Sequence, residues 1–161
     1  MQSEDPNVAT IVAFLDRIGI PVTIEPVAEG SFLPGVTVRY GTLVFDPDNL
    51  PHPGDLLHEA GHIAVTDPDV RGKIAEVSEN GGEEMAAITW SYAAALELGI
   101  DPAVVFHPEG YRGDSKTILG NFGKGQYFGV SLLDYYGMTA EAKWAEAKGM
   151  APYPKMARWL R

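Results

Sequence analysis

Residues 58–62 read HEAGH, which places His58 and His62 four positions apart with Glu59 between them. On an α-helix, positions i and i+4 lie on one face, so both imidazoles can bind one zinc ion at about 2.0–2.1 Å. The glutamate between them then faces the coordination position left for water, and it can take a proton from that water. This spacing predicts a metal site that carries its own general base.

The helix that carries this motif is expected from Pro53 to about Thr66. At about 100° per residue, its polar side chains fall in one sector: Asp55, His58, Glu59, His62 and Thr66. Its apolar side chains fall opposite and should face the core: Leu56, Leu57, Ala60, Ile63 and Ala64. Gly61 costs about 1 kcal/mol against alanine inside a helix, so another element is expected to approach the backbone there.

A catalytic zinc site has three protein ligands, so the two histidines need one more. The candidates are His52, His107 and the acids that follow the motif, of which Glu83 and Glu84 are favoured because they open a long apolar helix. That helix is expected over residues 83–98.

Helical phase distinguishes the two glutamates. Glu84 shares a face with apolar and small residues, whereas Glu83 lies towards Trp90 on the side expected to face outward. An acid on an inward apolar face is unfavourable unless it is paired or bound to a metal. Glu84 is therefore the predicted third ligand, and Glu83 is predicted to be its solvated neighbour.

This arrangement resembles the gluzincin group of HExxH metallopeptidases, because HEAGH is followed by a glutamate on a second helix. Glu84-x-x-Ala87 with Trp90 following is also similar to the small bacterial ImmA/IrrE-type zincins. The resemblance implies zinc held by His58, His62 and Glu84, with Glu59 as general base. It also implies a zincin-like layout: an N-terminal helix, a small β-sheet, the active-site helix and the glutamate helix. It covers about residues 8–99.

The chain departs from that family in two places. Many gluzincins carry Asn or Asp near the third ligand to hold a ligating histidine, but the position four after Glu84 is Ile88. Asp55, one helical turn before His58, is a candidate replacement. Gluzincins also use a Tyr or His to steady the oxyanion, and the candidates here are His107, Tyr111 and Tyr127.

The fold class is expected to be α+β, in a single domain over 1–161 with a core at about 8–99 and a C-terminal extension at about 100–161. Besides the two helices above, the pattern predicts a helix over 8–18, a strand over 21–26 and two short strands within 36–45. Residues 101–139 are expected to be irregular, with short helices around 116–122 and 131–136, and a last helix is expected over 140–148.

Composition excludes several other classes. The chain has no cysteine, which excludes disulfides, thiolate nucleophiles and cysteine-bound metals. A net charge of −10 argues against nucleic acid as a partner. No apolar run approaches the roughly 20 residues that span a bilayer, and the first residues lack the basic start of a signal peptide, so a soluble cytoplasmic protein is expected. No G-x-S-x-G elbow or Walker A sequence is present.

The sequence thus favours a zinc-dependent hydrolase, a metallopeptidase acting on a peptide or protein substrate. The alternative is a non-catalytic zinc-binding zincin-like module that acts through protein interaction, and the weakest is a scaffold whose site holds no metal. A fourth protein ligand, such as His52 or His107, would favour the non-catalytic module. The sequence does not predict an oligomeric state.

Overall fold

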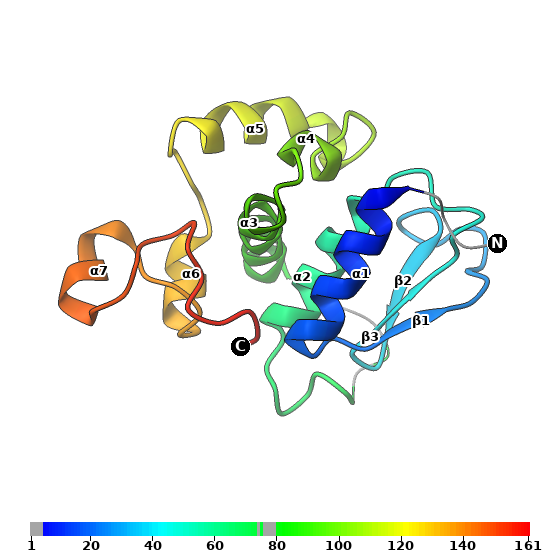
Figure 1. The fold of residues 1–161 in the computed structure, drawn as a ribbon, viewed down its shortest axis with the longest axis horizontal. Helices are drawn as coiled ribbons and strands as arrows, with labels where there is room; N and C mark the ends of the chain where they lie inside the picture. Colours follow the sequence, from blue (N-terminus) through cyan, green and yellow to red (C-terminus); the bar gives the residue numbers. More distant parts are fainter. Residues whose placement is uncertain (1–4, 74, 76–79) are drawn as a thin grey trace.

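The computed structural model describes residues 5–73, 75 and 80–161 and has an α+β fold (Figure 1). Within these residues, seven α-helices accompany one three-stranded sheet. The first half contains α1 (Pro6–Ile18), β1 (Val22–Ile24), β2 (Val36–Arg39), β3 (Thr42–Phe45) and α2 (Asp55–Val65). The second half contains α3 (Gly81–Leu98), α4 (Pro102–Val105), the 3₁₀ turn η1 (Tyr111–Gly113), α5 (Ser115–Gly123), α6 (Val130–Tyr135) and α7 (Ala142–Lys148).

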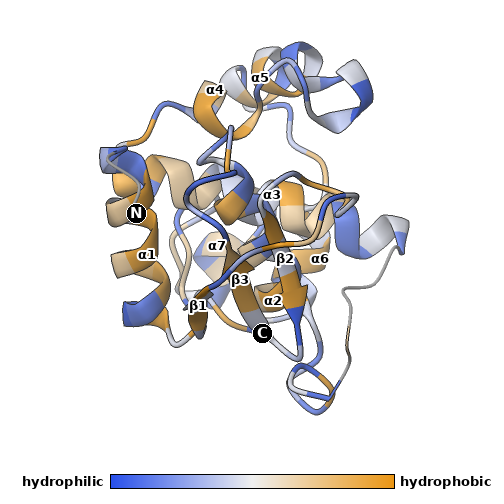
Figure 2. Ribbon diagram, turned by 90° about the vertical axis from the view of Figure 1, so that its right-hand side faces the viewer, coloured by the Kyte–Doolittle hydropathy of each residue, from blue (hydrophilic) through white to orange (hydrophobic). Residues whose placement is uncertain are grey.

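The sheet is small and mixed, with strand order β1-β3-β2. β1 runs parallel to β3, and β2 pairs antiparallel to β3 with Val36 opposite Phe45. The two residues between β2 and β3, Tyr40 and Gly41, both have positive φ, which is the geometry of a tight hairpin loop. The buried side chains of β2 and β3 join the same apolar cluster as those of α2. The strands are coloured as hydrophobic in Figure 2, whereas many of the connections are hydrophilic.

Local signals explain where most elements begin and end. α1 starts at Pro6, two residues before the predicted start, because the Asp5 side chain accepts a hydrogen bond from the Asn7 amide and caps the helix. Gly19 and Gly99, both left-handed, end α1 and α3 as expected. α4 was not predicted, although Asp101 caps it by the same mechanism.

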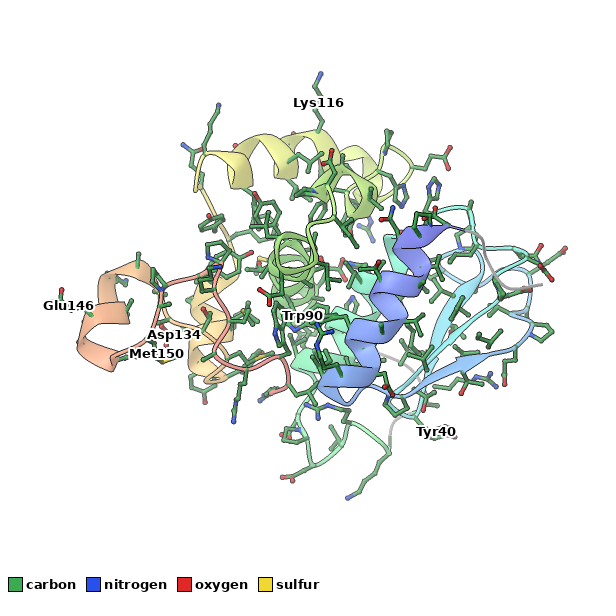
Figure 3. All side chains as sticks on the ribbon, viewed as in Figure 1. Tyr40, Trp90, Lys116, Asp134, Glu146 and Met150 are labelled. Carbon is green, nitrogen blue, oxygen red and sulfur yellow. The ribbon has the colours of Figure 1, made fainter. Side chains whose placement is uncertain are left out.

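α2 and α3 lie next to each other at the centre of the molecule (Figure 1) and are buried over most of their surface. The prediction that Trp90 faces outward is wrong, since its side chain is fully buried. Trp90, which is labelled in Figure 3, lies at the centre of the molecule. It packs against Phe14 of α1 and Trp159, with ring centroids 6.1 and 5.6 Å apart, and its indole N–H donates to the Trp159 carbonyl. The C-terminal residues, whose position the sequence pattern did not indicate, cover this side of α3.

The chain beyond α3 returns to the two central helices. The Tyr153 hydroxyl donates to the Thr89 carbonyl of α3 over 2.7 Å, and the Arg161 amide donates to the Ala64 carbonyl of α2 over 2.9 Å. Phe106, Phe122 and other residues of this part belong to the same apolar cluster as α1, the sheet and α2. No helix in the described part of the chain combines the length and apolarity that a membrane crossing requires.

Candidate metal centre

The two helices that carry the predicted ligands cross at Gly61. A Cβ atom at this position would lie 2.8 Å from the Ala87 carbonyl oxygen and 3.2 Å from the Trp90 ring. The expected close approach at Gly61 is therefore confirmed, and the approaching element is α3. Ala87 follows Glu84 by about one helical turn, so this contact fixes Glu84 against the histidine face of α2.

The structure brings His58, His62 and Glu84 together into one group that could hold a metal ion. Glu84 Oε1 lies 3.3 Å from His58 Nε2, and Glu84 Oε2 lies 2.7 Å from His62 Nε2. One ligand atom from each residue falls within 4.8 Å of the others. The histidine side chains are each 5% exposed and that of Glu84 is 41% exposed, so the carboxylate forms the side of the site nearest to solvent. Glu83 is not part of this group.

The chemistry of these donors suits a divalent cation. Burial, followed by the charge of His62, lowers the pKa of His58 to about 4, so this imidazole is neutral near pH 7 and its lone pair is free for a metal. Burial also disfavours the charged form of His62, but the hydrogen bond to Glu84 and the neighbouring carboxylates outweigh it and raise its pKa. Burial raises the pKa of Glu84, but the hydrogen bond to His62 and the charges of both histidines outweigh it. The net effect is that the pKa of Glu84 is lowered. Two imidazoles and a carboxylate are a donor set that zinc accepts.

Glu59 lies on the same helix as the two histidines and is 8% exposed. Burial, assisted by the nearby carboxylates of Glu84 and Asp55, raises the pKa of Glu59 to about 7 although His62 lowers it. A carboxylate with a pKa near the working pH is suited to accept and return a proton. Positive charge from a bound metal would lower this pKa and favour the ionised base.

Of the three candidates for steadying an oxyanion, Tyr111 is the one in contact with a predicted ligand. Its ring packs edge-on against His58 with centroids 5.1 Å apart. Its hydroxyl is buried and makes no hydrogen bond of normal geometry within the described residues. Burial and the carboxylates of Asp55, Glu84 and Glu59 raise the pKa of Tyr111 well above its usual value, although the nearby Ser91 side chain lowers it. The phenol is therefore protonated at neutral pH and can donate.

The other two candidates have different neighbours. His107 Nε2 lies 2.7 Å from Asp55 Oδ1, and Tyr127 packs in an aromatic cluster whose nearest ring, that of Tyr153, is 4.7 Å away. Asp55, the candidate for holding a ligating histidine, makes its hydrogen bond to His107 instead. His58 Nδ1 has no hydrogen-bond partner among the described residues.

Two arginines that were not predicted from the sequence hydrogen-bond the carbonyl groups at the C-terminal end of α2. The Arg71 side chain donates to the Ile63 carbonyl over 3.0 Å, and the Arg161 side chain donates to the Val65 carbonyl over 3.2 Å. Cations at this end stabilise a helix through both hydrogen bonds and the helix dipole. Arg161 is about a hundred positions from α2, so no local signal could indicate this role.

Comparison with known proteins found no family model, no curated protein and no solved structure that matches this chain. The resemblance to gluzincins therefore depends on the HExxH motif and on the group formed by His58, His62 and Glu84.

Proposed function

We propose that this protein is a zinc-dependent metallopeptidase with a zincin-like core, in which His58, His62 and Glu84 hold the ion. The observation that carries the proposal is the convergence of these three donors beside Glu59, a buried carboxylate whose pKa is raised to about 7. The order of elements supports the zincin-like interpretation, since a helix, a small sheet, the HExxH helix and the glutamate helix follow one another.

Each residue has a defined part in the proposed hydrolysis. A bound zinc ion would supply a Lewis acid that polarises the scissile carbonyl and lowers the pKa of water. Glu59 takes the proton from the attacking water and returns it to the leaving amine. Tyr111 donates a hydrogen bond to the carbonyl oxygen as that oxygen gains negative charge, and one such donor contributes a factor of about 10²–10³ in kcat.

The alternative, a zinc-binding module without turnover, would be favoured by a fourth protein ligand. Among the described residues no further histidine or acid joins the metal group. The two histidines named as possible fourth ligands are paired with carboxylates instead, His52 with Glu109 and His107 with Asp55, each over 2.7 Å. These pairings support the hydrolase over the module.

The test begins with metal analysis of the purified protein, where about one zinc per chain is expected. Hydrolysis of a broad peptide library is then compared between wild type and Glu59→Gln, with Glu97→Gln, an exposed glutamate on α3, as the control. Glu59→Gln should bind zinc with little change and lose hydrolysis by a factor of about 10²–10⁴.

Three results would overturn parts of the proposal. Failure to take up zinc refutes the metal site. A zinc-loaded wild type that cleaves nothing in the library makes the non-catalytic module the better interpretation. Equal cleavage by wild type and Glu59→Gln refutes the assignment of the base.

A further inference from the structure

The turn that carries Tyr111 has an unfavourable backbone conformation. Tyr111 and Arg112 have φ values of 57° and 53°, in the left-handed region that costs non-glycine residues about 1–2 kcal/mol each. Such a conformation persists only where the surrounding structure holds it. It places the Tyr111 ring between His58 and Phe106, with centroids 5.1 and 5.0 Å away.

His107 is the centre around which this turn is built. Its carbonyl accepts hydrogen bonds from the Gly110 amide over 3.1 Å and from the Ser115 hydroxyl over 2.6 Å. The Gly110 backbone rests on the imidazole, since a Cβ atom on Gly110 would lie 3.2 Å from His107 Cε1. The position of the ring therefore determines the position of the residues that lead into Tyr111.

Asp55 determines the position of that ring. Its Oδ1 accepts the hydrogen bond from His107 Nε2 over 2.7 Å, and the Asp55 residue is 2% exposed. The His52 ring stacks on the imidazole at a centroid distance of 3.7 Å and an angle of 9°. Asp55 is the first residue of α2 and precedes His58 by about one turn. The pair therefore ties the Tyr111 turn to the same rigid helix that carries both histidine ligands.

We propose that the Asp55–His107 pair is a positioning device that holds the Tyr111 phenol beside the metal group. Neither residue belongs to the group formed by His58, His62 and Glu84, and both act through Tyr111. The catalytic consequence depends on the proposed peptidase function, but the positioning itself does not, so the two can be tested separately.

The first test observes Tyr111 directly, by ¹⁹F NMR of protein labelled with 3-fluorotyrosine. Tyr111→Phe assigns the resonance among the seven tyrosines. In wild type this resonance should be shielded from a soluble paramagnetic agent. Asp55→Ala should shift the resonance and expose it to the agent while the six others stay in place, and Asp55→Asn, which keeps the acceptor oxygen, should preserve the wild-type signal.

Two further variants complete the set. His107→Phe retains a ring that can stack on His52 but has no N–H donor, so it should release Tyr111 as Asp55→Ala does. Glu109→Ala removes only the exposed partner of His52 and should leave the Tyr111 signal unchanged. The proposal is overturned if wild-type Tyr111 is accessible to the agent. It is equally overturned if the signal is unmoved in a folded Asp55→Ala or His107→Phe protein.

The second test applies if the wild type hydrolyses a peptide. Loss of a donor that acts on the transition state lowers kcat with little change in KM, so Asp55→Ala should behave in this way. Combined with Tyr111→Phe it should cause no further loss, because both changes remove the same interaction. Additive losses in the double variant contradict positioning through Tyr111. A wild type without activity refutes the proposed function, and the NMR result still decides the positioning.

Discussion

Replacing Gly61 with alanine tests whether the crossing of α2 and α3 sets the geometry of the metal group. The added Cβ would lie 2.8 Å from the Ala87 carbonyl oxygen, a backbone atom that cannot move without α3. A return to ordinary contact requires a shift of about 0.6 Å between the helices, because ordinary contact begins near 3.4 Å. Such overpacking costs about 1–3 kcal/mol, against a gain of about 1 kcal/mol from helix propensity. The expected net loss in the free energy of unfolding is about 0–2 kcal/mol.

The larger effect should be on the metal. A shift of α3 carries Glu84 away from His58 and His62, whose nitrogens lie 3.3 and 2.7 Å from its carboxylate oxygens. Disturbing the contacts that orient a metal-binding side chain typically weakens metal binding by about 10- to 100-fold. Competition with a chromophoric zinc chelator measures this change, and urea unfolding of the metal-free protein measures stability.

Gly120 on α5 provides the matched control for this experiment. No atom lies within 4 Å of a Cβ at Gly120, so Gly120→Ala should leave zinc affinity unchanged and add up to about 1 kcal/mol of stability. If Gly61→Ala gains as much stability as Gly120→Ala and binds zinc as wild type does, the crossing of α2 and α3 does not position Glu84.

Three further predictions concern the metal group and its helix. Glu84→Ala should weaken zinc binding far more than Glu83→Ala in the same chelator competition, because Glu84 alone of the two contacts the histidines; the reverse order would show that Glu83 is the ligand. In metal-free protein the folded state resists protonation of His58, whose pKa is lowered, so stability is lost as pH falls from 6.5 towards 4. The folded state also resists ionisation of Glu59, whose pKa is raised, so stability is lost as pH rises from 4.5 towards 7. Each effect amounts to up to about 3 kcal/mol. The two effects oppose one another, so each variant should show the effect of the residue that remains. In urea unfolding, Glu59→Gln should lose stability towards acid pH and His58→Gln should lose stability towards neutral pH. Parallel curves of stability against pH for the two variants would contradict the assignment. Arg71→Ala, which removes the side-chain donor to the Ile63 and Thr66 carbonyls at the end of α2, should cost about 1–2 kcal/mol in urea unfolding, and an unchanged midpoint would show that water replaces it.

Much of the metal group could be predicted from the sequence because the information is local. The periodicity of one helix places His58 and His62 on the same face whatever surrounds them. The same periodicity chose Glu84 over Glu83, and the structure places Glu84 beside both histidines. One premise of that choice was wrong, since the side of α3 near Trp90 is buried and not exposed, and the role of Glu84 as a metal ligand stays a prediction.

Only the tertiary structure decided what surrounds that group. Trp90 is buried because the residues around Trp159 cover it, and the Tyr111 ring packs on His58 from a left-handed turn that is hydrogen-bonded to His107, which in turn pairs with Asp55. These contacts join residues between 50 and 70 positions apart, and each depends on where several elements pack at once. Helical and strand periodicities carry no information about such distant pairs. The sequence by itself therefore determined which side chains could hold a metal and which helices carry them, and packing determined how they are covered and which phenol lies beside them.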